Sequence, residues 1–593
     1  MKCFFRFVYP IVLTVVACWL TFDLHGRPTR GVDDAQILFS YSSNLAAGRG
    51  FVYANNPQHV EGATSFLWTL ICAVPFRLGF DESGVLVISI ILLCFTQILV
   101  IDMIRRSAAA QQVQSWPFEL AYLLAVFSSP TYLTWMSITL MDTCLWGLLV
   151  VLMTYVAVSP PYSRLGAVVA SVPFFLAPLS RPEAVVVAPA IIGLAWLRGA
   201  DHREGRRRLS VSLAAAFLVS AVAVTVFRLS YFGYPLPNTF YAKVSPSLAY
   251  NLTAGAWYLA GYVLNSGSIV VAAALFLLWC AGDSAVRVAT GLRHGARLTN
   301  RDGVATWRVT ALAAMVLLVI PVLTGGDHFV GYRFYQPAFP VMLLAAVLFL
   351  IARLPLGGIE CLAPRRRPKP GLAAAVLLMG LVYWAYSGAN DPSWLQADLD
   401  PQKVIKDQFT AADGGIKDGS RLRALFSGSE RFPAVGVTAA GGIARTYPGR
   451  IVDLMGLNTP VIAHRPGARR GFKNHAAFEK DAFFEIGDID VLVASPPVPP
   501  ATSSGVSRAL KGLLDDTRFV SDWRYGVLYL TKDDVSDFEA FYPVRFIDSL
   551  EGTGRYRFRE TMRWSGKRWV VADGTDSVQV GRGTDSGPDM VGS

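Results

Sequence analysis

Charged residues are scarce in this sequence. Only 16% of its 593 residues are Asp, Glu, Lys or Arg, whereas 53% are hydrophobic. Because soluble domains usually carry about 25% charged residues, this composition excludes a large soluble enzyme and indicates a polytopic membrane protein. The formal net charge of +11 does not indicate nucleic-acid binding, since the arginines collect in short loops between apolar segments, where they signal membrane orientation.

Cysteines are also few, and several common motifs are missing. The chain has seven cysteines and none follows Cys361, so the C-terminal part cannot contain a disulfide. No CxxC motif or Cys/His cluster predicts a zinc site. The sequence also lacks a Walker A motif and a GxGxxG motif, so a soluble nucleotide donor is not indicated.

Long apolar runs, by contrast, recur over most of the chain. A membrane span needs about 20 mostly apolar residues, and we expect about eleven spans. They cover residues 4–22, 84–104, 117–129, 143–158, 167–179, 184–197, 209–227, 255–280, 309–323, 337–351 and 371–386. The first lacks a convincing small-residue cleavage site, so we interpret it as an uncleaved span rather than a signal peptide.

A further apolar stretch, residues 64–80, is ambiguous, and the positive charges decide its placement. If it crossed the membrane, Arg105 and Arg106 would lie outside the cytoplasm, as would the basic clusters at 198–208 and 365–369. If it forms a juxtamembrane helix on the outer surface, every cluster lies inside, as orientation by positive charge requires. We therefore expect a multi-pass protein of the bacterial cytoplasmic (inner) membrane, with its N-terminus inside and its C-terminal domain outside.

The composition changes near residue 388, after which no apolar run is long enough to span a membrane. Short β-like runs at 422–426, 435–438, 451–454, 491–494 and 527–530 alternate with helical segments at 477–486 and 506–514. This alternation predicts a small α/β domain. We expect a membrane domain over residues 1–388, an extracytoplasmic α/β domain over 389–570 and a disordered tail, rich in Gly, Ser and Asp, over 571–593.

Two adjacent acids, Asp33 and Asp34, follow the first span and fall in the first external loop. Carboxylates at a lipid interface are costly, so such a pair predicts a functional site. Behind it, Ile37, Leu38 and Tyr41 recur at helical spacing and predict a helix that lies in the membrane interface. The alternative is that the acids only cap this helix at its positive end, but capping requires one aspartate rather than two.

The other external loops supply further polar groups. The acids are Glu61, Asp142 and Asp327, the cations are Arg181, Lys243 and Arg333, and His328 could be either. A helix cap is an equal alternative for Asp142, and an ion pair with Glu183 is the alternative for Arg181. Acids suit deprotonation of a hydroxyl, and cations at a lipid interface suit a phosphate. The combination predicts a lipid-linked phosphate as substrate and a hydroxyl as nucleophile.

In this order and spacing, the residues resemble the GT-C class of membrane glycosyltransferases, which use polyprenyl-phosphate-linked sugars outside the cytoplasm. Within that class the sequence is most similar to the terminal β-arabinofuranosyltransferases of mycobacterial cell-wall arabinan. The matching stretches are Asp33-Asp34, Asn44-Leu45, Ala47-Gly48, Val60-Glu61, Thr64-Ser65, Trp68, Arg181-Pro182-Glu183, residues 231–243, Gly325-Gly326-Asp327, Val452-Asp453, Gly456-Leu457 and Pro460.

The resemblance implies a mostly α polytopic membrane protein with the GT-C fold, interfacial helices and a C-terminal extracytoplasmic α/β domain. It also implies inverting transfer of a sugar, D-arabinofuranose by this likeness, from a polyprenyl-phosphate donor. Asp34 would be the general base, and Asp33 would support it or help to hold a cation. The remaining substrate-binding residues would neutralise the departing phosphate, hold sugar hydroxyls or orient the cations; they are Glu61, Asp142, Arg181, Lys243, Asp327, His328 and Arg333.

Several partners are compatible with the sequence. The acceptor is a glycan or a surface protein such as a pilin, and the C-terminal domain would help to bind it. Asp453 follows a β-like run, where residues often touch ligand, whereas His464 and His475 are expected to be structural or surface residues, with glycan contact as the alternative. A divalent cation (Mg²⁺, Mn²⁺ or Ca²⁺) is compatible with so many carboxylates, although some members of the class need none.

Other functions are alternatives to this assignment. Within the same class they are a protein mannosyltransferase and an oligosaccharyltransferase, whose C-terminal domain should bind protein sequons. From another class, the alternative is a transporter or flippase of lipid-linked sugars. A transporter predicts inverted repeats and broken helices near the bilayer midplane, and the sequence shows no internal repeat.

Overall fold

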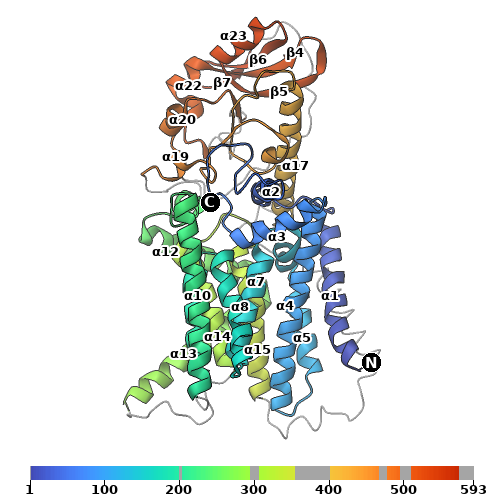
Figure 1. The fold of residues 1–593 in the computed structure, drawn as a ribbon, viewed down its shortest axis with the longest axis vertical. Coiled ribbons are helices and arrows are strands. Elements are labelled where there is room, and N and C mark those ends of the chain that lie inside the picture. Colours follow the sequence, from blue (N-terminus) through green and yellow to red (C-terminus); the bar gives the residue numbers. More distant parts are fainter. Residues whose placement is uncertain are drawn as a thin grey trace.

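The computed structural model describes residues 2–198, 203–293, 306–353, 401–466, 477–494 and 509–572. A bundle of helices makes up the first part of the chain, and a smaller domain with a β-sheet follows it (Figure 1). The N-terminus lies at one end of the bundle, and the C-terminal domain stands on the opposite end (Figure 1). The predicted architecture, a mostly helical protein with a C-terminal domain of strands and helices, is therefore confirmed.

The helices of the bundle leave many apolar side chains exposed. Their bounds are α1 (Lys2–Leu24), α2 (Asp33–Ala46), α3 (Phe66–Arg77), α4 (Glu82–Ala110), α5 (Trp116–Phe127), α6 (Pro130–Leu133), η1 (Thr134–Ile138), α7 (Thr143–Val158), α8 (Arg164–Ser180), α9 (Ala184–Arg198), α10 (Arg203–Tyr231), α11 (Asn238–Lys243), α12 (Leu248–Asn265), α13 (Ser268–Arg293), α14 (Thr306–Thr324), η2 (Arg333–Ala338) and α15 (Phe339–Arg353). Val168, Leu218 and Leu278 are 61%, 56% and 69% exposed. Such surfaces suit contact with lipid rather than with water.

Within the described residues, five helical segments are long and apolar enough to cross a membrane: α1, α4, α10, α14 and the continuous stretch of η2 and α15. A sixth candidate joins α6 and η1 to α7, and the apolar helices α5, α8 and α9 are shorter. The predicted spans between residues 4 and 351 are all helical, although one of them is broken. The predicted span 371–386 lies outside the described residues, as do the domain boundary at 388 and the tail beyond 572.

The predicted span 255–280 is wrong as a single helix, because α12 ends at Asn265 and α13 begins at Ser268. Gly267 between them has a φ of +85°, a left-handed conformation that glycine favours and that interrupts a right-handed helix. Hydropathy does not reveal this break, since apolar residues continue on both sides of it.

A second break separates η1 from α7, where the chain bends by 105°. The segment η1 is a π-helix, a feature that is frequent at functional sites. Leu140 has a φ of +58° although it is not a glycine, and its carbonyl oxygen accepts a hydrogen bond from Trp68 Nε1 at 3.1 Å. Strained backbone of this kind persists only where its surroundings fix it. The bend places Asp142 immediately before α7.

The C-terminal domain is built on a seven-stranded sheet with the order β2-β1-β3-β5-β4-β6-β7. Its elements are α17 (Pro401–Leu425), β1 (Val435–Val437), α18 (Ile443–Thr446), β2 (Ile451–Asp453), α19 (Pro460–Ala463), α20 (Lys480–Ile486), β3 (Val491–Val493), η3 (Leu513–Asp515), α22 (Thr517–Asp522), β4 (Trp523–Leu530), β5 (Asp533–Pro543), α23 (Val544–Gly552), β6 (Tyr556–Trp564) and β7 (Trp569–Val571). Strand β1 pairs in parallel with β2 and β3, and the remaining pairs are antiparallel.

The predicted strands at 435–438, 451–454, 491–494 and 527–530 are confirmed as β1, β2, β3 and part of β4. The predicted strand at 422–426 is wrong, because these residues end the helix α17. Leu422, Leu425 and Phe426 are all fully buried, and their spacing of three and four positions is that of a helix face. A run of five residues is too short to distinguish the apolar pattern of a helix from that of a buried strand.

The helices α2 and α3 lie between the bundle and the C-terminal domain (Figure 1). Helix α3 has 12 residues, too few to span a bilayer at about 1.5 Å per residue, in agreement with the predicted juxtamembrane helix. Helix α2 differs from the prediction, because it is not open to the membrane interface. Its polar residues Gln36, Ser40 and Asn44 are buried and bond to the first external loop. Helices α17 and α18 of the C-terminal domain also pack against this helix.

Candidate active site

Asp34 lies in the first turn of α2, where two cations from distant parts of the chain meet its carboxylate. Lys243 Nζ, at the end of α11, is 3.3 Å from Asp34 Oδ2, and Arg333 Nη1 is 3.4 Å from the same oxygen. The Asp34 side chain is 18% exposed. The fold thus brings together three predicted site residues that the sequence separates by 209 and 299 positions.

Asp327 and His328 complete this group, which we call the Asp34 cluster (Asp34, Lys243, Asp327, His328 and Arg333). The fully buried carboxylate of Asp327 forms an ion pair with Arg333 Nε. Its Oδ1 atom lies 3.2 Å from His328 Nδ1. Asp327 therefore holds Arg333 in the orientation that faces Asp34.

The surroundings also fix Arg333. Its guanidinium carbon lies 4.2 Å from the ring centroid of Phe329, within the range of a cation–π contact. Tyr332, the preceding residue, has a left-handed φ of +50°, and its hydroxyl accepts a hydrogen bond from Asn265 Nδ2 at 2.9 Å. Since a non-glycine residue in this conformation is strained, the contacts on both sides of it must hold the backbone.

The cations determine the protonation of the Asp34 cluster. Burial would raise the pKa of Asp34, but Lys243 and Arg333 outweigh it and lower this pKa to about 2. Burial likewise opposes ionisation of Asp327, yet Arg333 and His328 hold the pKa of Asp327 well below its ordinary value. Both carboxylates are therefore ionised at neutral pH. While the two cations face it, Asp34 is a weak base.

A second group, the Arg181 cluster, consists of Asp142, Arg181 and Glu183. Arg181 Nη1 donates to Asp142 Oδ2 at 2.9 Å, and its Nε and Nη2 atoms donate to Glu183 at 3.1 and 2.8 Å. The ion pair with Glu183, which was the alternative to substrate binding for Arg181, is thus present. Asp142 precedes α7 but makes no side-chain capping hydrogen bond. Because two carboxylates surround one guanidinium, this cluster carries excess negative charge.

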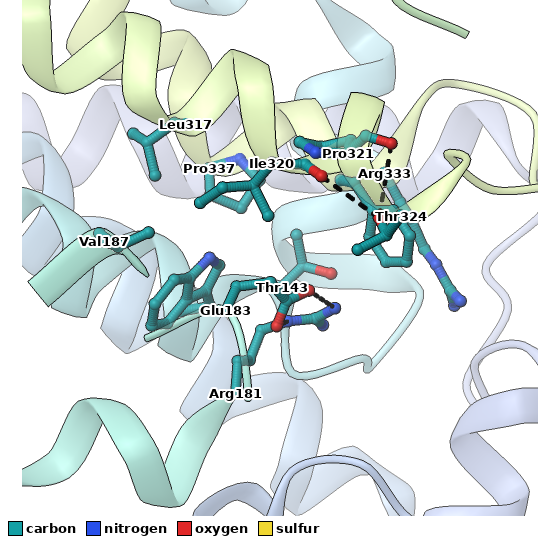
Figure 2. A pocket seen from close by; sticks show the side chains of 12 residues that line it. Thr143, Arg181, Glu183, Val187, Leu317, Ile320, Pro321, Thr324, Arg333 and Pro337 are labelled. Carbon is teal, nitrogen blue, oxygen red and sulfur yellow. Dashed lines mark hydrogen bonds and ion pairs between the residues drawn. The ribbon is translucent and has the colours of Figure 1, made fainter. Parts of the chain in front are cut away.

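A cavity lies against both clusters (Figure 2). Its polar lining residues are Thr143, Arg181, Glu183, Thr324 and Arg333, and its apolar ones are Trp146, Val187, Leu317, Ile320, Pro321, Phe334 and Pro337. Its volume is about 20 Å³, which is room for about one water molecule. Figure 2 shows Arg181 and Glu183 together, with Val187 and Leu317 on the side away from Arg333. The lining combines charged and apolar side chains, as a site for an amphiphile would, but the cavity must widen to admit one.

Of the predicted site residues, only Arg181 and Arg333 line this cavity, and Glu61 and Asp33 belong to neither charged cluster. Both carboxylate oxygens of Glu61 accept hydrogen bonds from Arg228, at 2.7 and 2.8 Å, and neither side chain is more than 5% exposed. The carboxylate of Asp33 accepts backbone hydrogen bonds from Gly441 and Gly442. The structure thus gives both acids partners within the protein, and contact of Glu61 with substrate stays a prediction.

The sequence interpretation missed Arg228 and the contacts of the C-terminal domain. Arg228 lies near the end of α10, where hydropathy marks it only as a charge at the edge of a span. The Asp453 carboxylate accepts from the backbone N–H groups of Met455 and Asn458, both at 2.9 Å. Asn458 Oδ1 accepts in turn from the Tyr41 hydroxyl at 2.9 Å. The matching stretches around residues 452–457 and the position of Asp453 after a β-like run pointed to this region, but not to these contacts.

His464 joins the C-terminal domain to the loop before α11. Its ring stacks on Tyr234 with a centroid distance of 3.9 Å and lies 4.3 Å from Tyr241. One ring nitrogen is 3.1 Å from Asn238 Oδ1. The expected structural role of His464 fits these contacts, and His475 lies outside the described residues.

Among the residues that the structure describes, no three His, Cys, Asp or Glu side chains are grouped so as to hold a metal ion. In both charged clusters the carboxylates face arginine or lysine side chains instead.

No protein-family model and no curated protein matches the chain. Solved structures show a distant likeness. ArnT from Cupriavidus metallidurans, bound to undecaprenyl phosphate, is 12% identical at a TM-score of 0.43, over 76% of this chain and 86% of that one. The oligosaccharyltransferase of Archaeoglobus fulgidus in its apo form is 13% identical at a TM-score of 0.42, over 91% and 75%. AglB from Archaeoglobus fulgidus, in complex with an inhibitory peptide and a dolichol-phosphate, is 13% identical at 0.40, over 90% and 74%.

Proposed function

We propose that this protein is a membrane glycosyltransferase of the GT-C class, which transfers a sugar from a polyprenyl-phosphate donor to an extracytoplasmic acceptor. The observation that carries the proposal is the position of Asp34 between Lys243 and Arg333, of which Arg333 also lines a cavity with polar and apolar walls. A carboxylate suits the acceptor hydroxyl, the two cations suit a phosphate, and apolar walls suit a prenyl chain.

The charges favour the Asp34 cluster over the Arg181 cluster as the phosphate site. The Asp34 cluster contains two carboxylates and two permanent cations, so it is neutral before His328 is counted. The Arg181 cluster carries excess negative charge, which repels a phosphate. Its carboxylate oxygens instead accept hydrogen bonds from sugar hydroxyls. The donor sugar then lies between the two clusters, with its phosphate against Lys243 and Arg333.

The reaction is a single displacement with inversion. The acceptor hydroxyl oxygen attacks the anomeric carbon while the bond from that carbon to the phosphate oxygen breaks. The hydroxyl proton passes to the Asp34 carboxylate, and the polyprenyl phosphate departs with one more negative charge. Lys243 and Arg333 neutralise that charge. A positioned general base typically contributes about 10²–10⁴-fold to the rate.

Donor binding also explains how an aspartate of low pKa can serve as a base. In the free protein, Lys243 and Arg333 face Asp34 and lower its pKa. A donor phosphate that binds these cations competes for them and adds a nearby negative charge, which raises the pKa of Asp34. Asp34 therefore becomes a stronger base only when the donor is in place.

The finer assignments follow from the resemblance to the terminal β-arabinofuranosyltransferases. The donor sugar is then D-arabinofuranose, and the acceptor is a cell-wall or surface glycan or a surface protein such as a pilin. With the basic loops in the cytoplasm, the active site and the C-terminal domain face the outside of the cytoplasmic membrane.

Transfer assays with purified protein test this proposal. The protein would be incubated with polyprenyl-phospho-arabinofuranose or polyprenyl-phospho-mannose, each with arabinan fragments and with peptide acceptors. We expect transfer of arabinofuranose to the glycan with inversion at the anomeric carbon. Transfer only from the mannose donor would overturn the choice of sugar. No transfer from any polyprenyl-phosphate sugar, with donor movement across proteoliposome membranes, would favour a flippase instead.

A further inference from the structure

Asp33 faces the C-terminal domain, although its neighbour Asp34 faces the cations of the bundle. Asp33 Oδ2 accepts a hydrogen bond from Gly441 N at 3.0 Å, and Oδ1 accepts one from Gly442 N at 2.8 Å. The Asp33 residue is only 9% exposed. Both oxygens of a buried carboxylate are thus bonded to two consecutive N–H groups that lie 408 and 409 positions away in the sequence.

The two glycines are required by close approach rather than by backbone conformation. A Cβ atom on Gly441 would lie 1.9 Å from the carbonyl oxygen of Asp33 and 2.8 Å from its Oδ1. A Cβ atom on Gly442 would lie 2.3 Å from the carbonyl oxygen of Ala412 in α17. Any side chain at Gly441 would therefore separate the C-terminal domain from the start of α2.

Further contacts connect the same surfaces. On α2, the Tyr41 hydroxyl donates to Asn458 Oδ1 at 2.9 Å. In the loop after α2, Asn56 donates from Nδ2 to the carbonyl oxygen of Ile451 at 2.8 Å and accepts from Ile451 N at 3.0 Å. The C-terminal domain thus holds α2 and the loop that follows it at several points.

The first turn of α2 depends on these contacts, because it has no cap of its own. Its N-cap residue is Val32, which makes no side-chain hydrogen bond, and Asp33 bonds outside its own helix. Uncapped helix ends fray unless other groups hold them. A shift of about 1 Å at a catalytic group can cost on the order of 10²-fold in rate.

We propose that the C-terminal domain completes the catalytic site, with Asp33 as a positioning residue. Its bonds to Gly441 and Gly442 fix the first turn of α2 and direct Asp34 towards Lys243 and Arg333. The inference rests on the proposed function, since it takes Asp34 as the base. The two acids then have different roles: Asp34 receives the proton, and Asp33 fixes the position of Asp34.

Gly441→Ala and Asp33→Asn test this role against a matched control. Gly414→Ala, in α17, adds a methyl group with no neighbour within 4 Å. We expect kcat per folded molecule to fall about 10–100-fold in both test variants and to stay unchanged in the control. Donor affinity, measured separately by binding, should change less than about two-fold, because Lys243 and Arg333 remain. A merely structural contact would lower the melting temperature without this loss of kcat.

Hydrogen exchange provides a readout that does not need activity. In Gly441→Ala, the amides of residues 34–38 should exchange faster than in the wild type and in Gly414→Ala. Wild-type exchange together with wild-type kcat in both test variants would overturn the inference. If instead the wild-type protein transfers no sugar, the proposed function fails. The exchange of residues 34–38 in Gly441→Ala still tests the contact: faster exchange shows that the C-terminal domain holds α2, and unchanged exchange shows that it does not.

Discussion

Asp33 and Asp34 are adjacent acids whose surroundings give them different properties. Lys243 and Arg333 overcome burial and lower the pKa of Asp34 to about 2. Burial raises the pKa of Asp33 to about 6, although two backbone N–H groups oppose this effect. Successive residues of a helix point about 100° apart, so one acid faces the bundle and the other the C-terminal domain. In the sequence the two acids differ only by the roles that the resemblance implies, whereas the structure shows their different surroundings.

Replacement of Lys243 tests the phosphate site. Lys243→Gln removes one charged contact, which is worth about 1.5–3 kcal/mol when it is buried. The expected result is a rise of about 10–100-fold in the KM for the donor, with a smaller fall in kcat. Lys417→Gln, at an exposed position of α17, is the control. A donor KM within two-fold of the wild-type value in Lys243→Gln would contradict the assignment.

The buried carboxyl of Asp453 predicts a pH dependence of stability. Burial raises its pKa from 3.8 to about 6, although hydrogen bonds from Asn458 and Met455 oppose the shift. Folding therefore takes up a proton between these two pH values. The stabilisation is fully present below pH 3.8 and is lost as the pH rises through about 6. The difference in melting temperature between the wild type and Asp453→Asn should change across this window, and a constant difference would contradict the prediction.

At the level of elements, the periodicity of apolar residues predicted most helices. It failed where contacts between elements determine the local secondary structure. The span 143–158 coincides with α7, because its apolar run begins after a polar turn and ends at Ser159. The break at Gly267 escaped prediction, because the polar run at residues 265–268 is short and lies within a long apolar stretch. Strands β5 and β6 were not predicted, because charged residues such as Arg557 and Glu560 interrupt their apolar pattern, and β7 has only three residues.

Gly31 tests how the first external loop is fixed to the bend before α7. Gly31 has a φ of +69°, and a Cβ atom there would lie 2.6 Å from the Thr139 carbonyl oxygen. Gly48 has a similar φ of +74° with no atom within 4 Å. Gly48→Ala should therefore cost only the strain of about 1–2 kcal/mol, whereas Gly31→Ala should destabilise more and reduce activity. Equal melting temperatures for the two variants would contradict the close approach of Gly31 to the Thr139 carbonyl oxygen.

At the level of the whole molecule, the sequence predicted which residues meet but not all of their contacts. Loop polarity pointed to Asp34, Lys243, Asp327 and Arg333, and the fold joins them in one cluster. The sequence could not show that Glu61 pairs with Arg228, because such pairing depends on how α10 packs against the first external loop. It could not show either that Asp33 belongs to an interface between the two parts of the chain.

The orientation of the protein in the membrane is a second property of the whole molecule. Arg105 donates to Glu119 at 2.8 and 3.0 Å, and Tyr9 of α1 contacts the same carboxylate. The N-terminal half of α1 and the basic end of α4 therefore lie together, at the end of the bundle opposite the C-terminal domain (Figure 1).

Reporter fusions test this orientation. A phosphatase reporter, which is active only outside the cytoplasm, should be active when fused after Gly388 and inactive when fused after Ala110, the last residue of α4. The reason is the positive charge near the end of α4. The reverse pattern would place the Asp34 cluster in the cytoplasm and remove the proposed site.

The transfer rate of Asp34→Asn, measured together with its donor affinity, tests the central claim most directly. An amide cannot take the proton, so the rate from polyprenyl-phospho-arabinofuranose should fall by about 10²–10⁴-fold. Donor affinity should be kept or increased, because Lys243 and Arg333 no longer face a competing carboxylate. The control is Asp81→Asn, at the exposed N-cap of α4, where asparagine is about as good a cap as aspartate. Turnover by Asp34→Asn equal to that of the wild type would contradict the account.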